Sequence, residues 1–226
     1  MNRPACIVKT HPLSGVAFSI TDDIQIPNKW RKSIITYALV RGTQDILDQS
    51  LERKIINLAI LRWSEEIPLI IRPVKLKDNP DIKIIFLSSS EDSYFAGDGS
   101  ILAWSGYPET SLQGQMHFND DYRWSKDGSP IKAHLADPTH YPDPFDPTTF
   151  KTYNLNQTFF HEFGHILGEV HIQTCPACIM YPYYNDTLEL QPIEITRIQD
   201  KYGLSKYSAS LYKRIKDWMH LRIRNE

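Results

Sequence analysis

Three histidines and one glutamate occur in a short stretch whose spacing suits metal-dependent hydrolysis. His161 and His165 stand four residues apart, so on a helix both imidazoles project from one face. Catalytic zinc is held by three protein ligands and keeps a fourth position for water. Glu162 follows the first histidine and is placed to take a proton from that water. Gly168 permits a sharp turn after the helix, which would bring His171 round as third ligand.

A helix with two histidines one turn apart can also be an ordinary helix that binds no metal. The glycine and the third histidine complete H-E-x-x-H-x-x-G-x-x-H, the zinc signature of the metzincin peptidases. Met180 follows nine residues after His171, where the methionine turn of a metzincin passes beneath the metal. Methionine in an apolar stretch is by default a core residue, but its place after the third histidine favours the turn.

The stretch His161–His171, followed by Ile-Met-Tyr-Pro-x-Tyr at 179–184, resembles the matrixins, the matrix metalloproteinase family. The resemblance implies an α+β fold with a twisted five-stranded mixed sheet, two long helices and a short C-terminal helix. It implies a zinc-dependent endopeptidase in which Glu162 is the base, the three histidines hold the metal and Met180 supports it. The rival classes are a non-catalytic zinc-binding module and a different metzincin branch.

Strand-like and helical runs alternate from about residue 30 onward, as the resemblance implies. Ser33–Val40, Leu69–Val74 and Ile82–Leu87 predict strands. Between the first two, apolar residues at helical spacing predict a helix capped by Thr43 or Asp45. This order favours a mixed sheet packed against the helix.

Two further helices are expected around the metal-binding stretch. The active-site helix should span Tyr153–Val170 with Asn154 or Asn156 as cap, and Ile193–Gly203 reads as a short amphipathic helix ended by glycine. We therefore expect an N-terminal extension (1–29), a peptidase domain (30–203) and a C-terminal extension (204–226). The last is basic and amphipathic, which predicts an appended helix on the domain; contact with a partner or membrane is the alternative.

The resemblance also implies how a peptide substrate binds. It lies antiparallel along an edge strand, so that main-chain hydrogen bonds give affinity and pockets give selectivity. An apolar S1′ pocket would favour an apolar side chain after the scissile bond. Tyr183 and Tyr184 can equally be packing residues. The two banks of the cleft would be Ile101, Leu102 and Ala103 on the edge, and Pro182, Tyr183 and Tyr184 on the wall.

Other metal sites of the family are only partly matched. Trp104 stands where the family has a structural-zinc histidine and His117 alone matches, so we predict that this second zinc is absent. His134 and His140 are the remaining candidate substitutes. Calcium would find hard oxygen ligands in three acids, which can equally be ordinary turn residues. These acids are Asp98, Asp120 and Asp121.

The three cysteines are too few for a disulfide scaffold. Cys175 and Cys178 can close a small ring before the methionine turn or form half of a zinc site, and the lack of a second pair disfavours the latter. Cys6 is the odd residue, either an unpaired thiol or a faint counterpart of the pro-segment cysteine that silences matrixin zymogens. The proline-rich segment 126–150 would border or cover the cleft.

Composition sets limits on the partners. A net charge of −2 gives no reason to expect nucleic acid, and no apolar run approaches the roughly 20 residues of a membrane span. We expect a monomer that acts on a protein or peptide. The resemblance implies secretion, but the first residues lack the apolar region of a signal peptide, so an intracellular location stays open.

Overall fold

The computed structural model describes residues 28–46, 48–97, 101–129, 152–185 and 187–205, and the backbone of 6–9, 131–132 and 149–150. Its elements are, in chain order, β1 (Cys6–Lys9), β2 (Ile34–Arg41), α1 (Gln49–Ser64), β3 (Ile70–Pro73), the 3₁₀ turn η1 (Leu76–Asp78), β4 (Ile82–Leu87), α2 (Ser93–Gly97), β5 (Ile101–Ser105), β6 (Gln115–Asn119), β7 (Arg123–Ser125), β8 (Ile131–Lys132), β9 (Thr149–Phe150), β10 (Thr152–Asn154), α3 (Leu155–Ile166) and α4 (Pro192–Tyr202).

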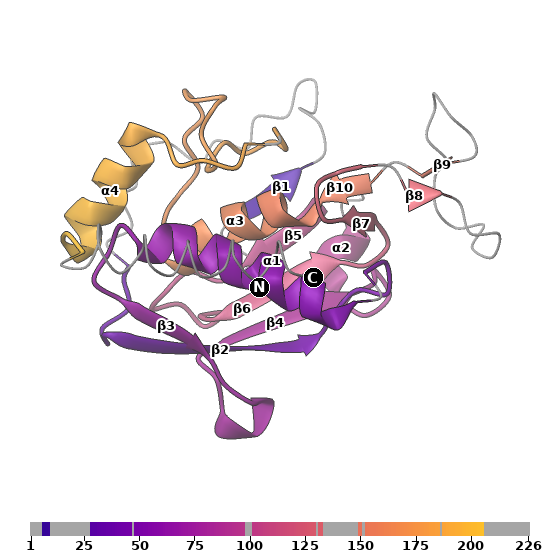
Figure 1. Ribbon diagram of the computed structural model, residues 1–226, viewed down its shortest axis with the longest axis horizontal. Helices are drawn as coiled ribbons and strands as arrows, with labels where there is room; N and C mark the ends of the chain where they lie inside the picture. Colours follow the sequence, from indigo (N-terminus) through magenta and orange to yellow (C-terminus); the bar gives the residue numbers. More distant parts are fainter. Residues whose placement is uncertain are drawn as a thin grey trace, which may run out of the picture.

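The main sheet has the strand order β1-β5-β6-β4-β2-β3, and helices α1 and α3 lie on one side of it (Figure 1). β2 pairs parallel with β3 and β4, and β4 pairs parallel with β6. β5 runs antiparallel to β6. These five strands confirm the predicted mixed sheet and the α+β class. The sequence did not predict the sixth strand, β1, which covers the otherwise unpaired edge of β5.

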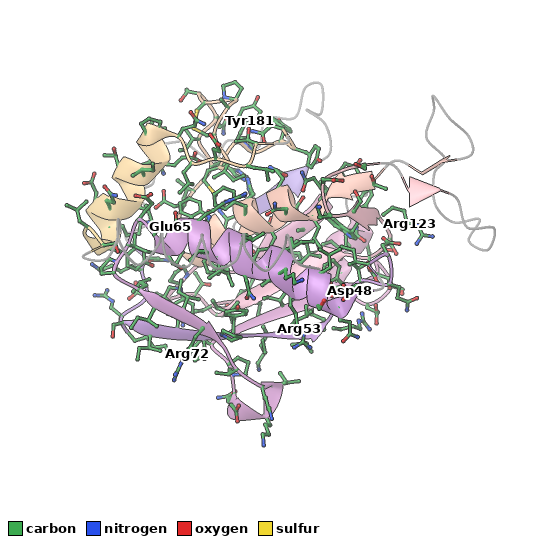
Figure 2. All side chains as sticks on the ribbon, viewed as in Figure 1. Asp48, Arg53, Glu65, Arg72, Arg123 and Tyr181 are labelled. Carbon is green, nitrogen blue, oxygen red and sulfur yellow. A yellow bond between two sulfur atoms is a disulfide. The ribbon has the colours of Figure 1, made fainter. Side chains whose placement is uncertain are left out.

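Helix α1 buries an apolar stripe that includes Ile56, Ala59 and Trp63 against the sheet and α3. The predicted caps are wrong: Asp48 caps α1, and its side chain accepts a hydrogen bond from Ser50 N. The predicted caps have other partners. Asp45, for example, accepts hydrogen bonds from Arg123 Nη1 at 2.6 Å and Trp124 N at 2.8 Å. Figure 2 labels Asp48 and Glu65 at the two ends of α1.

Helix α3 begins at the predicted cap Asn154, whose side chain accepts from Gln157 N. It is shorter than predicted at both ends. The residues before it form β10, and Gly168 has a φ of 86°, which ends the helix in the predicted turn. Indole N–H groups fix its position: Trp63 donates to Phe160 O at 2.9 Å and Trp30 to Ile166 O at 2.8 Å.

Two short strand pairs lie outside the main sheet. β7 pairs parallel with β10, and β8 pairs antiparallel with β9. Most of the predicted loop 126–150 and nearly all of the C-terminal extension lie outside the described residues. Among the described helices, none combines the length and apolar character that a membrane span requires.

Gly164 lets α3 approach the chain beneath it. A Cβ placed there would lie 2.3 Å from Met180 Sδ and 2.9 Å from Trp63 Cζ2. Both side chains are fully buried, so they have little room to move. The close packing of α3 on Met180 therefore requires glycine at this position.

We predict that Gly164→Ala lowers the free energy of unfolding by about 1–3 kcal/mol, since overpacking a dense core has this cost. Chemical denaturation of the zinc-free protein would measure it. Arg53→Ala, at an exposed position of α1, is the control and should change stability by less than about 0.5 kcal/mol. Equal stability of the Gly164 variant and the wild type would show that the contact with Met180 is not tight.

Candidate active site

Three imidazoles from α3 and the following turn converge on one point. His165 Nε2 lies 3.0 Å from His161 Nε2, which lies 3.2 Å from His171 Nε2. In tetrahedral zinc sites with Zn–N distances of about 2.0–2.1 Å, the ligand nitrogens stand roughly 3.3 Å apart. The three ligand atoms lie within 4.8 Å of one another and form the one metal-binding group found among the described residues. The spacing fits a zinc ion.

Backbone carbonyls orient two of these rings. His161 Nδ1 lies 2.5 Å from Ile179 O, and His165 Nδ1 lies 2.6 Å from Glu169 O. A carbonyl can only accept a hydrogen bond, so each Nδ1 carries the proton and each Nε2 turns its lone pair to the shared point. The arrangement selects the tautomer that a metal needs.

The site also keeps the imidazoles uncharged. Burial lowers the pKa of His161 to about 4, against a smaller opposing effect of the Ile179 carbonyl. Burial, followed by the proximity of the other imidazoles, lowers the pKa of His165 well below its ordinary value, and His171 behaves similarly. Neutral imidazole is the form that binds metal, so these rings have the protonation state that a metal ion requires.

Glu162 presents one held and one free carboxylate oxygen. Its Oε2 accepts a hydrogen bond from Ser105 Oγ at 2.5 Å, whereas its Oε1 is buried and has no hydrogen-bond partner among the described residues. Burial raises the pKa of Glu162 to about 8, and the Ser105 hydroxyl opposes part of that rise. A carboxyl group with a raised pKa and a free oxygen can accept and return a proton near neutral pH.

Met180 lies fully buried against α3, in a turn held from both sides. Ile172 N donates to Met180 O at 2.9 Å, and Met180 N donates to Glu194 Oε1 at 2.8 Å. Cys175 and Cys178 form a disulfide that closes a small ring ahead of this turn. In Figure 2, Tyr181 marks this segment above α3.

A buried ion cluster fixes the turn between the second and third histidines. Glu169 is 1% exposed and lies 3.2 Å from Arg197 Nε and 2.9 Å from Lys201 Nζ, both on α4. Lys201 Nζ also donates to Gly168 O. Nothing in the local sequence pattern links Glu169 to a helix about 30 residues later, so this cluster could not be predicted from the sequence.

A hydrogen-bonded group occupies the region where the resemblance puts a second zinc. Asp92 Oδ2 lies 2.7 Å from His117 Nδ1 and accepts from Trp104 Nε1 at 2.9 Å. Burial would raise the pKa of Asp92, but these hydrogen bonds and one from Tyr94 N lower it below its usual value. The two candidate substitutes, His134 and His140, lie outside the described residues. The absence of a second zinc therefore stays a prediction.

The structure places two of the three predicted calcium ligands, the neighbouring residues Asp120 and Asp121. Asp98 lies outside the described residues. Burial raises the pKa of Asp120 to about 6. Asp121 Oδ2 accepts a hydrogen bond from Ser89 N at 2.9 Å. Calcium binding stays a prediction that these contacts neither require nor exclude.

The two predicted banks of the cleft differ in what they offer. The side chains of Ile101, Leu102 and Ala103 are buried, so β5 presents its backbone. Pro182 and Tyr183 are half-buried, and Tyr184 packs on Tyr153 with its hydroxyl accepting from Asn154 N at 3.0 Å. Tyr184 therefore has the packing role that the sequence left open.

The edge of β5 is paired with β1 in the structure. β1 runs antiparallel to β5, with Cys6 opposite Ser105 and Val8 opposite Ala103. β1 thus occupies the main-chain positions that the sequence analysis assigned to a peptide substrate.

The mixed sheet, the long helix with two histidines, and the methionine turn together define a zinc peptidase site. A family model described as matrixin matches residues 29–203. Human matrilysin is 33% identical over 211 residues, which are 90% of this chain and 70% of that protein. Mouse stromelysin-1 is 31% identical over 182 residues, 77% of this chain and 33% of that protein. Matrix metalloproteinase-18 of Xenopus laevis is 31% identical over 212 residues, 91% of this chain and 38% of that protein.

The chain belongs to the matrixin family. Members of this family use a catalytic zinc, so the chain is classed as a zinc metalloendopeptidase, a hydrolase.

We predict that Glu169→Ala weakens zinc binding about 10- to 100-fold, the range typical when a group that orients metal ligands is lost. Without the Glu169 carboxylate, this turn would lose its ion pairs with Arg197 and Lys201 of α4. The main-chain carbonyl of residue 169, which orients His165, would then be held less firmly. A competitive titration against a chromogenic chelator would measure the affinity. Glu91→Ala removes an exposed ion pair with Arg41 and should leave the affinity unchanged. Unchanged affinity in the Glu169 variant would contradict the role of the ion cluster.

Proposed function

We propose that the chain hydrolyses peptide bonds with zinc held by His161, His165 and His171 and with Glu162 as the general base. The observation that carries this proposal is the geometry of Glu162. It directly follows a histidine of the triad, and its Oε1 is buried with no hydrogen-bond partner among the described residues. This placement also disfavours a non-catalytic zinc-binding module, which has no need of a buried base.

Bound zinc would act as a Lewis acid toward the scissile carbonyl and lower the pKa of a water molecule toward about 7. Glu162 Oε1 would take the proton from that water and later give it to the leaving amine. Zinc bound nearby would lower the pKa of Glu162, which burial alone raises to about 8, and would thereby favour the carboxylate form that a base requires. Met180 would support the three rings from below without binding the metal.

The substrate would be a peptide in extended form, lying between the edge strand β5 and the wall 182–184. Because Ile101, Leu102 and Ala103 are buried, β5 would contribute main-chain hydrogen bonds and little side-chain selectivity. The antiparallel pairing of β1 supports this direction of binding. A peptide bound in this way would have to displace β1. An apolar S1′ pocket would provide the selectivity.

The remaining parts of the proposal concern the whole protein. We infer one zinc per chain, no second zinc, a calcium ion bound by Asp98, Asp120 and Asp121, a monomer and an extracellular location, which is typical of the family. The domain would span 30–203 with an extension at each end. Metal analysis tests the zinc content, light scattering tests the monomer and limited proteolysis tests the domain bounds. A melting temperature that does not change when calcium is added would contradict the calcium site.

The central experiment is cleavage of a quenched fluorescent peptide with Leu after the scissile bond. Glu162→Gln should lower kcat about 10²- to 10⁴-fold, because that is the usual contribution of general acid–base catalysis. A zinc chelator should abolish cleavage. Glu189→Gln, an exposed glutamate, is the matched control and should match the wild type.

Three results would count against the proposal or a part of it. Full activity of Glu162→Gln would exclude Glu162 as the base. Absence of cleavage by the zinc-loaded wild type, with any residue after the scissile bond, would favour the zinc-binding module. Equal rates with Leu and Asp at that position would exclude an apolar S1′ pocket while leaving the zinc chemistry intact.

A further inference from the structure

Ser105 is the last residue of β5 and makes the one hydrogen bond found for the Glu162 carboxylate among the described residues. Its Oγ donates to Glu162 Oε2 at 2.5 Å, a short distance typical of a hydroxyl bound to a carboxylate. Both side chains are 0% exposed. The two residues come from different elements, β5 and α3, and are 57 positions apart in the sequence.

The register of β5 aims Ser105 at α3. Successive side chains of a strand point to opposite faces. Trp104, the preceding residue, packs with Phe95 and donates its indole N–H to Asp92. Ser105 is the next residue and faces the other side of the sheet. It lies opposite Met116 of β6, which belongs to the core that α3 covers, and its hydroxyl reaches Glu162 there. A slip by one residue would turn Ser105 away from the site.

We propose that Ser105 is a positioning residue for the peptidase reaction. Its hydroxyl holds Oε2 of Glu162 and thereby directs Oε1 to the water that attacks the peptide. A glutamate side chain has several rotatable bonds, and a base that is fixed in advance loses no rate to misplacement. This inference rests on the function proposed above, in which Glu162 is the base.

A purely structural role for Ser105 would have a different consequence. A buried hydroxyl needs a partner, and Ser105 could simply satisfy itself on a nearby carboxylate. In that case Ser105→Ala would change stability but would leave Glu162 where it is, and the turnover of the folded enzyme would not change. The position of Glu162 and the separation of kcat from KM distinguish the two roles.

The test compares zinc-loaded wild type, Ser105→Ala, Ser105→Thr and Ser125→Ala. Ser125 is also a buried strand serine, but its hydroxyl bonds to Thr152. Each protein is checked for zinc content and folding, then assayed with the fluorescent peptide, and crystal structures of wild type and Ser105→Ala are compared. We expect kcat of Ser105→Ala to fall roughly 10- to 100-fold with KM little changed, and its Glu162 carboxylate to move.

Ser105→Thr keeps the hydroxyl and suits a strand, so it should recover kcat to within about threefold of the wild type. Ser125→Ala should match the wild type. An unchanged kcat in Ser105→Ala, or a folded Ser105→Thr that stays as slow as the alanine variant, would overturn the proposal. A wild type that cleaves nothing would instead contradict the proposed function. The crystal structures would then decide the role of Ser105, and an unmoved Glu162 would refute it.

Discussion

The packing around the active site depends on one requirement, which is that three imidazoles stay uncharged and face one point. Charged or misdirected rings would repel a cation. His161 and His165 are buried and His171 is half-buried, and protonation of all three rings is disfavoured. Burial alone would not aim them. The carbonyls of Ile179 and Glu169 fix the rings of the two helical histidines, and the turn at Gly168 brings the third histidine in.

These requirements explain why segments distant from the metal site are packed so closely around it. Ile179 sits in the turn that Glu194 holds through Met180 N, and Glu169 is held by α4. Helix α3 must approach that turn, which Gly164 permits, while Trp63 ties α3 to α1. Stability and metal binding are therefore coupled through the same contacts, because loosening the turn also releases the groups that orient the ligands.

Local patterns were enough to predict part of this. The spacing of the histidines, the Asn154 cap and the position of Met180 depend on residues close in sequence, and the five-stranded sheet follows from strand-like runs and the family resemblance. The cap at Asp48 was missed because Asp45 is equally suited chemically but is already bound to Arg123. The contacts of Ser105 with Glu162 and of Glu169 with α4 join distant segments, so no single-sequence periodicity could reveal them.

The central claim is that one zinc ion is held by three imidazoles and one oxygen. X-ray absorption spectroscopy at the zinc edge, on protein with a measured metal content, tests it most directly. We expect one zinc per chain with three nitrogen ligands and one oxygen at about 2.0–2.2 Å. A sulfur shell at about 2.3 Å, six-coordinate zinc, or a second equivalent of tightly bound zinc would contradict it.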